Sequence, residues 1–251
     1  MCNLYNVTTN QEAIRDLSNW DWSSVGNLEP SLDVWPDYKA PIVRNIDGKR
    51  ELANVRWGLP SSQKAQLDAT SKRADKLRAK GKEVDEAAFA ELLRMEPDKG
   101  TTNVRNTSSK HWRRWLGIEN RCVVPSTSFA EPDWRSGSFS NAWFALSEER
   151  PLFFFAGIWV PQWESVRKVK DGLTNDDLYG FLTTEPNEIV APVHQKAMPV
   201  LLTERDEIET WLTAPWEEAG KLQRPLPDDK LMIVDAPAKT DDDLPEQGSL
   251  L

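Results

Sequence analysis

Cys2 is the residue of this chain whose chemistry is least ordinary. If the peptide bond between Met1 and Cys2 is cut, a thiol and a free α-amine stand on the same residue, and an initiator Met is normally removed before a side chain this small. The amine of such a 1,2-aminothiol condenses with an aldehyde to a Schiff base, and the thiolate closes the adduct into a five-membered thiazolidine. The sequence therefore indicates a covalent trap for aldehydes. A cysteine that merely fills a small apolar space is the alternative.

Two further stretches place an acid or a base beside an apolar strand. Glu131 follows the apolar run 121–129, and a carboxyl group in such a place is partly desolvated, which raises its pKa and suits it to proton transfer near neutral pH. His194 stands between two prolines ahead of the apolar stretch 198–202, and imidazole ordinarily titrates near neutral pH. Taken singly, a Glu at a strand end is usually solvated and a lone His is more often structural.

A polar run at 102–109 precedes a basic and aromatic stretch at 110–115. Arginines, amides and hydroxyl groups beside tryptophans are what a site for single-stranded nucleic acid needs: cations contact phosphates, and indole rings stack on bases. A capped helix with basic side chains lying along its surface explains the same residues equally well.

Composition restricts the class of protein. A chain of 251 residues with 39% hydrophobic side chains is long enough for the packed core of one large domain. Two cysteines and two histidines supply neither a disulfide framework nor a Cys/His metal cluster, so we expect no metal and no cofactor. No run approaches the roughly 18 apolar residues of a membrane span, and no signal-peptide pattern is present. We therefore expect a monomer in the cytoplasm, in bacterial-type cytosol or associated with the nucleoid.

The charge balance argues against indiscriminate binding of polyanions. The chain has 31 Lys and Arg against 40 Asp and Glu, a net charge of −9, and its pI is about 4.9. Sequence-independent affinity for nucleic acid comes from neutralising phosphates, so any nucleic-acid site must be local. Twelve tryptophans are present; most belong in a core, and some are candidate surfaces for stacking on bases.

The apolar pattern predicts one domain of mixed α+β type over residues 1–234, with a compact β core flanked by helices. The stretch 61–100 is rich in charge of both signs, with Ala and Leu at helical spacing, which predicts one or two solvated helices in an exposed insertion; a nucleic-acid arm is the less favoured interpretation. The acidic stretch 235–251 has a composition typical of a disordered tail. Strands are expected at 2–7, within 35–44, and at 52–57, 121–129, 142–146, 151–160, 179–184, 198–202 and 231–234. Residues 45–49 are typical of a hairpin turn, and residues 9–12 of the capped start of an amphipathic helix.

Five motifs in order along the chain resemble those of the SRAP family, the SOS response-associated peptidase domain. They are Met1-Cys2, Trp57-Gly58-Leu59, Asn103-x-Arg105, Arg121-Cys122-x-x-Pro125 leading to Glu131, and His194 ahead of Met198-Pro199. The resemblance spans Cys2 to about Leu212. It implies a barrel-like mixed β core and a function in DNA damage, in which Cys2 forms a thiazolidine crosslink with the ring-opened aldehyde of an abasic site in single-stranded DNA.

The resemblance also implies roles for the other motif residues. Asn103 orients the amine or the sugar, Glu131 transfers protons during ring opening and Schiff-base formation, and His194 is the partner acid or base. Four residues are expected to contact DNA: Arg105 at a phosphate, Trp57 and Pro41 against bases, and Lys196 where the family commonly has Arg.

Some positions depart from the commoner family pattern. Asn3-Leu4 stands where many members have Gly-Arg, so one phosphate-binding cation is missing and we expect weak reversible binding to DNA. Two alternatives remain open from the sequence. One is a cysteine peptidase with Cys2 as its N-terminal nucleophile, including removal of its own leader. The other is a non-catalytic binder of single-stranded DNA.

Overall fold

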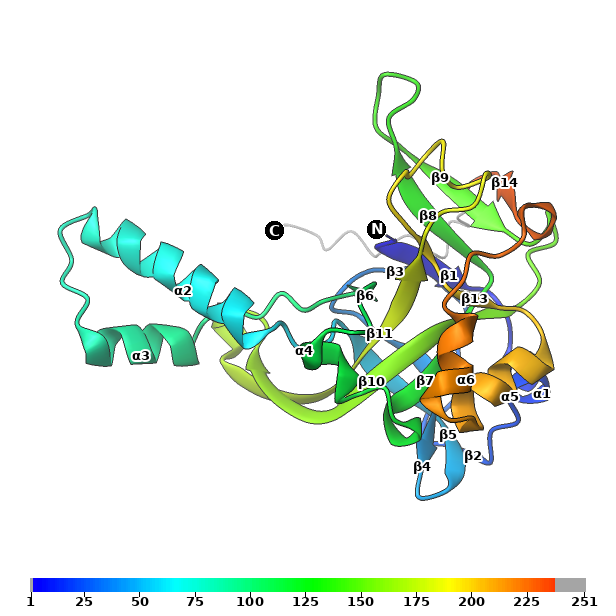
Figure 1. Cartoon of the computed structure of the whole chain (residues 1–251), viewed down its shortest axis with the longest axis horizontal. Coiled ribbons are helices and arrows are strands. Elements are labelled where there is room, and N and C mark those ends of the chain that lie inside the picture. The colour runs from blue at the N-terminus through cyan, green and yellow to red at the C-terminus, as the bar shows by residue number, and fades with distance from the viewer. Residues whose placement is uncertain (1, 238–251) are drawn as a thin grey trace, which may run out of the picture.

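Five strands close into a barrel, around which the other elements are arranged (Figure 1). The computed structural model describes residues 2–237. Neighbouring strands follow the order β11-β10-β7-β4-β5, and a parallel pairing of β5 with β11 closes the ring. The predicted mixed α+β fold with a barrel-like core is confirmed. The barrel strands are β4 (Lys39–Ile46), β5 (Lys49–Trp57), β7 (Arg121–Ser126), β10 (Phe153–Val166) and β11 (Leu173–Thr184).

The β4–β5 hairpin shows how local sequence sets the barrel register. Asp47 and Gly48 connect the strands, and both have positive φ, +50° and +76°. A two-residue turn of this kind matches the twist of the strands it joins, and Asp-Gly is one of its preferred pairs. Pairing therefore begins at once, with Ile46 opposite Lys49, as the predicted turn requires.

Aromatic rings fill the barrel. The rings of Phe155 and Phe181 stack with centroids 4.4 Å apart, and the Tyr5 ring meets that of Trp57 edge to face at 5.2 Å. All four side chains are buried. Such pairs add roughly 0.5–1.5 kcal/mol each beyond the burial of their area, so the barrel is a packed core and leaves no channel at this level.

A second sheet lies against the barrel and carries the start of the chain. Its strand order is β14-β9-β8-β1-β3, so β1 lies between β8 and the edge strand β3 and is antiparallel to both. The residues just before β1 therefore lie beside the ends of β8 and β3. Its strands are β1 (Leu4–Val7), β3 (Ser31–Val34), β8 (Ser128–Asp133), β9 (Ser140–Ala145) and β14 (Met232–Val234).

Short elements complete the domain. Helix α1 (Gln11–Ser18) begins at the predicted cap, since the side chain of Asn10 accepts a hydrogen bond from the amide of Ala13 at 2.9 Å. The other helices near the barrel are α4 (Lys110–Arg113), α5 (Arg205–Thr213) and α6 (Trp216–Ala219), and the short strands are β2 (Trp22–Ser23), β6 (Asn103–Val104), β12 (Met198–Pro199) and β13 (Leu201–Leu202). Among the described residues, no helix is long and apolar enough to span a bilayer.

Two helices project from the barrel as an arm, α2 (Gln63–Arg78) and α3 (Glu86–Arg94), capped by Ser62 and Asp85 (Figure 1). We call residues 62–98 the arm; it falls within the stretch 61–100, where solvated helices were predicted. One prediction nearby was too short: β10 and β11 continue well beyond 151–160 and 179–184 as a paired ribbon. Most of the extra length is polar, and only Val166 and Leu178 of it are buried, so it lacks the apolar run that marks a buried strand. Residues 238–251 of the predicted acidic tail lie outside the described part of the chain.

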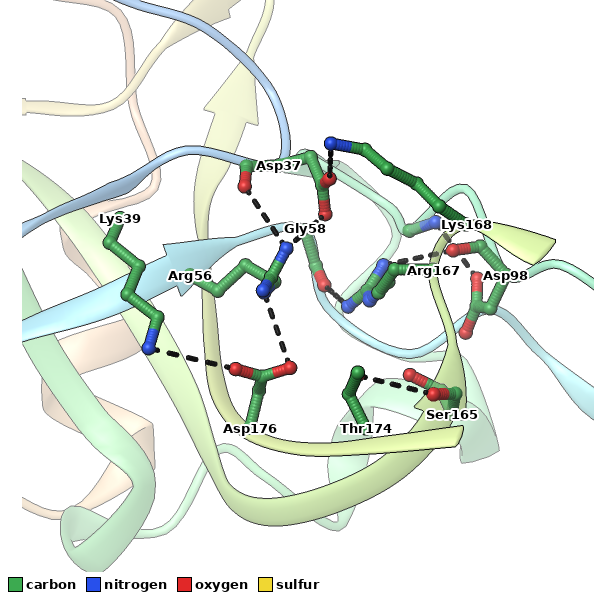
Figure 2. A network of polar contacts seen from close by, with 11 residues as sticks. Asp37, Lys39, Arg56, Gly58, Asp98, Ser165, Arg167, Lys168, Thr174 and Asp176 are labelled. Atoms are coloured by element: carbon green, nitrogen blue, oxygen red, sulfur yellow. Dashed lines mark hydrogen bonds and ion pairs between the residues drawn. The ribbon is translucent and has the colours of Figure 1, made fainter. Parts of the chain in front are cut away.

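The base of the arm is held by a buried arginine at the end of β10 (Figure 2). The guanidinium group of Arg167 donates to the carbonyl oxygen of Gly58, where the chain enters the arm, and to that of Asp98, where it leaves, the latter at 3.1 Å. A short antiparallel bridge between Leu59 and Thr101 ties the same two segments together. The arm is thus fixed at its root by contacts to both of its ends.

Gly100 is predicted to be intolerant of any side chain. Its φ is +74°, and a Cβ atom there would lie 2.5 Å from a guanidinium nitrogen of Arg167 and 2.9 Å from the Cα of Gly58. Gly100→Ala should therefore lower the free energy of unfolding by about 2 to 4 kcal/mol, combining left-handed backbone strain with overpacking. Denaturant unfolding measures this.

Gly81→Ala is the matched control. Gly81 has the same φ of +74° but nothing within 4 Å of its Cβ position, so only the backbone strain of about 1 to 2 kcal/mol applies. Equal destabilisation by the two substitutions would contradict the close packing described for the base of the arm.

Candidate active site around Cys2

Strand β1 places Cys2 beside the strand that carries Glu131. Leu4 pairs with Ala130, so the antiparallel register brings the preceding residue, Asn3, level with Glu131. The Cys2 side chain is fully buried, and its thiol donates to the carbonyl oxygen of Leu4 at 3.5 Å. The start of the chain is thus held inside the fold, where a thiol can be positioned.

Asn103 contacts the backbone of Cys2 directly. Strand β6 runs parallel to β11, with Asn103 paired to Phe181, and the Asn103 amide nitrogen donates to the Cys2 carbonyl oxygen at 2.9 Å. The Asn103 side-chain oxygen is buried and accepts no hydrogen bond from the described residues. It is therefore placed to accept a hydrogen bond from an amine or a hydroxyl group that enters the site.

Glu131 is buried in β8, and burial raises its pKa, whereas the nearby His194 imidazole, when protonated, acts in the opposite direction. Burial raises the pKa of the Cys2 thiol as well, and the neighbouring Glu131 carboxylate raises it further. Two electrostatic couplings therefore link Cys2 to Glu131 and Glu131 to His194. A carboxyl group with a raised pKa exchanges protons more readily near neutral pH than an exposed one.

His194 is oriented by the turn that precedes β12. Its Nδ1 lies 2.8 Å from the carbonyl oxygen of Ala197 and 3.2 Å from the amide nitrogen of the same residue. The shorter contact favours the tautomer in which Nδ1 donates to the carbonyl, which leaves the lone pair of Nε2 to accept a proton. Met198 pairs with Thr184 at the end of β11, which anchors the turn.

The structure thus brings together all four residues that the sequence assigned to catalysis, from four distant segments. A hydrogen bond joins Asn103 to Cys2, and electrostatic couplings join Cys2, Glu131 and His194. The set holds a thiol, an amide and two groups that transfer protons. Among residues 2–237, no group of three or more His, Cys, Asp and Glu side chains is arranged to hold a metal ion.

Two residues expected to contact bases lie inside the fold. Trp57 is fully buried, its ring stacks on that of Phe181 with centroids 5.2 Å apart, and its indole nitrogen donates to the carbonyl oxygen of Thr102 at 3.2 Å. Pro41 is buried within β4. Neither offers an exposed face in this structure, because both belong to the wall of the barrel; Trp57 instead packs against the segment that leads to Asn103.

The two basic residues expected to contact DNA, Arg105 and Lys196, are both exposed and lie next to each other. Arg105 donates to the carbonyl oxygen of Lys196 at 3.0 Å and forms an ion pair with Glu185 at 3.2 Å. A phosphate group approaching Arg105 therefore competes with a carboxylate.

Exposed aromatic rings that the sequence did not single out lie at the strand ends that flank Cys2. Trp35 is 40% exposed and directly follows Val34, which pairs with Tyr5 of β1. Trp134 is 65% exposed and directly follows β8. Each has Asp within two residues and Pro beside or near it, a composition typical of turns.

Comparisons with known proteins identify relatives. The profile of a family described as SOS response associated peptidase (SRAP) matches residues 1–239. No curated protein sequence matches significantly. A protein of known structure from Bordetella bronchiseptica is 25% identical, covers 95% of this chain and all of its own length, and superimposes with a TM-score of 0.62.

Two further solved structures share the fold. A protein from Bacteroides thetaiotaomicron is 21% identical with a TM-score of 0.63, covering 92% of this chain and 90% of its own. A phage-related protein from Bordetella bronchiseptica is 15% identical with a TM-score of 0.58, covering 92% of each chain.

The raised pKa of Glu131 predicts a pH-dependent cost to stability. Between the unfolded pKa of about 4.5 and the higher folded pKa, the native state binds more protons than the unfolded state, so the free energy of unfolding falls as pH rises through this window. The glutamine of Glu131→Gln does not titrate, so the variant does not lose this part of its free energy of unfolding as the pH rises. The variant should therefore be more stable than wild type near pH 7, with the difference shrinking as pH falls towards 4, in denaturant titrations at each pH.

Glu149→Gln is the control with the opposite sign. Glu149 is exposed, and a hydrogen bond from the Ser147 hydroxyl lowers its pKa, so its removal should slightly reduce stability at neutral pH. A difference between Glu131→Gln and wild type that stays constant from pH 4 to 8 would rule out the raised pKa.

Proposed function

The chain belongs to the SOS response associated peptidase (SRAP) family, and we propose that Cys2, once the bond to Met1 is cut, crosslinks itself to an abasic site in single-stranded DNA. Family membership supports a role related to DNA damage. The observation that carries the finer proposal is the placement of Asn103 and Glu131 beside Cys2, with His194 next to Glu131.

The first step of the proposed reaction is opening of the sugar. The closed hemiacetal of an abasic deoxyribose has no reactive carbonyl group, so a proton must reach the ring oxygen while another leaves the C1 hydroxyl group. Glu131, with its raised pKa, supplies the first proton, and Nε2 of His194 accepts the second. The product is the open-chain aldehyde.

The second step joins the aldehyde to Cys2. The α-amine adds to the aldehyde carbon, and loss of one water molecule from the adduct gives a Schiff base. The thiol then adds across the carbon–nitrogen double bond and transfers its proton to the nitrogen, which closes the thiazolidine. Asn103 holds the Cys2 carbonyl group, and its buried side-chain oxygen accepts a hydrogen bond from the amine. Overall, amine, thiol and aldehyde give thiazolidine and water.

Burial of the thiol suits this order of events. Its pKa is raised well above the usual value, so it is protonated at neutral pH and a weak nucleophile towards other electrophiles. Addition to a Schiff base formed on the same residue is intramolecular, and proximity replaces the nucleophilicity that the thiol lacks. Selectivity for an aldehyde therefore comes from the amine, which must react first.

A second candidate function is cleavage of the chain's own peptide bond before Cys2. The family description, which names a peptidase, favours it, and the Cys2 thiol is the nucleophile that such a reaction needs. The two functions are compatible, because self-cleavage would expose the amine that the crosslink uses.

Crosslinking predicts an adduct that depends on one thiol. Cleaved wild-type protein incubated with an oligonucleotide holding one abasic site should give a species that resists denaturation and migrates above the free protein in a gel. Cys2→Ser should give none. Glu131→Gln and His194→Gln should each slow its formation by about 10²- to 10⁴-fold, as loss of a general acid or base does.

Cys122→Ser is the matched thiol control. Cys122 is the other cysteine, is equally buried, and packs in β7 against Gly157, so its loss should leave the adduct unchanged. An adduct in Cys2→Ser, or none with wild type, would sink the proposal. Mass spectrometry of the same samples separates self-cleavage from trimming by another enzyme: only self-cleavage leaves Met1 in place in Cys2→Ser.

The ion pair between Arg105 and Glu185 predicts a gain of DNA affinity when the carboxylate is removed. Glu185→Gln should free Arg105 for a phosphate, so affinity for undamaged single-stranded DNA should rise and the slope of log K against log salt should steepen by about 0.7. Fluorescence anisotropy in the Cys2→Ser background measures both.

Glu188→Gln, an exposed carboxylate close in sequence, makes the same change in net charge without touching Arg105. Equal slopes for the two variants would show that Arg105 does not contact a phosphate.

A further inference from the structure

The charges of the arm are separated along its length. Residues 63–82 carry seven Lys or Arg against two Asp, whereas residues 83–98 carry six Asp or Glu against one Arg. The first half is α2 with the turn after it, and the second half contains α3. A basic helix thus projects from a chain whose net charge is −9 (Figure 1).

Ion pairs within the fold use only the arginines of this basic half. Arg73 contacts Glu96 at 3.3 Å, and Arg78 contacts Asp75 of its own helix at 3.0 Å. In α3, Glu91 is paired with Arg94 at 2.7 Å. Five exposed lysines form no ion pair with any carboxylate of residues 2–237: Lys64, Lys72, Lys76, Lys80 and Lys82. Packing against acidic α3 therefore does not account for their charge.

Three of these lysines form a row. Lys72, Lys76 and Lys80 follow each other at four-residue spacing, which puts them on one side of α2 and the turn after it, whereas the buried residues Thr70 and Ala74 lie on another side. Like charges at this spacing destabilise a helix by about 0.2–0.5 kcal/mol per pair. No carboxylate of residues 2–237 lies within ion-pair distance of these three lysines, so they remain available to a bound polyanion.

The root of the arm lies close to the site. The bridge between Leu59 and Thr101 is two residues from Asn103, and Arg167 holds both ends of the arm (Figure 2). Helix α2 has 16 residues and so a length of about 24 Å.

We propose that the lysine row of α2, Lys72, Lys76 and Lys80, binds the phosphodiester backbone of single-stranded DNA that extends from the covalent site. The position of the lesion rests on the proposed function, but the binding itself needs neither Cys2 nor a lesion. The arm supplies cations that the site around Cys2 lacks. Arg105 is already paired with Glu185, and Leu4 is an uncharged residue where many family members have Arg. Lysine contacts to phosphates release counterions, so this binding is independent of base sequence and sensitive to salt.

The test is the salt dependence of binding by Lys72→Gln/Lys76→Gln in the Cys2→Ser background. The probe is an undamaged, fluorescein-labelled oligothymidylate of about 20 nucleotides, followed by anisotropy over a range of salt concentrations. The slope of log K against log salt should become shallower by about 0.7 for each lost contact, or about 1.4 for the double variant. Circular dichroism should show α2 intact, because the substitutions remove a like-charge pair.

Lys49→Gln/Lys221→Gln is the matched control, since both lysines are exposed, lie outside the arm, and form no ion pair within the described residues. It changes net charge equally and should leave the slope close to that of Cys2→Ser alone. Equal slopes for the arm and control variants would overturn the inference and leave the surface for a partner other than nucleic acid. An arm effect on the slope without any adduct on abasic DNA would refute the proposed function alone; an adduct without an arm effect would refute this inference alone.

Discussion

One strand, β11, sets the geometry on which the rest of the structure depends. Along its length it changes partner: it pairs with β10 through most of its span, with β5 at Leu178 and Tyr179, with β6 at Phe181 and Leu182, and with β12 at its end. The pairing with β5 closes the barrel, and the next two pairings fix the segments that carry Asn103 and His194. Barrel closure and site assembly are therefore consequences of the same backbone hydrogen bonds, and a shift of register in β11 would disturb both.

The site is built at a cost to stability that the barrel must offset. A buried carboxyl group with a raised pKa and a buried thiol are each less stable in their charged forms than they would be in water. A buried amide oxygen without a partner among the described residues, on Asn103, adds a further desolvation cost of about 1–3 kcal/mol. The aromatic packing inside the barrel supplies rigid support for these groups, which is the usual relation between a strained site and a well-packed scaffold.

The sequence could single out the four candidate site residues because each lies in a short motif with recognisable local chemistry, such as Glu131 at the end of an apolar strand. It also predicted the hairpin at Asp47-Gly48, which depends on only two residues. It did not predict that β5 pairs in parallel with β11, because residues some 120 positions apart carry no local signal for pairing. The burial of Trp57 was missed for the same reason. The local sequence around a Trp at a strand end is the same whether distant strands cover the side chain or leave it exposed.

The charge of the arm illustrates another limit of reading composition. The nearly equal numbers of basic and acidic residues in 61–100 indicated a pair of solvated helices. Such a count does not show the order of the charges along the chain. Because α2 and α3 are separate helices, that order places most of the basic residues on or beside one helix and most of the acidic residues on or beside the other. A basic element on an acidic protein also fits covalent capture. Strong electrostatic affinity would hold the protein on intact DNA, which is far more abundant than damaged DNA. Under the proposed function, with a net charge of −9, local contacts would suffice for brief encounters, and retention would be left to the bond that Cys2 forms with an aldehyde. Selectivity would then reside in the chemistry at Cys2, and weak reversible binding to intact DNA would make that selectivity effective.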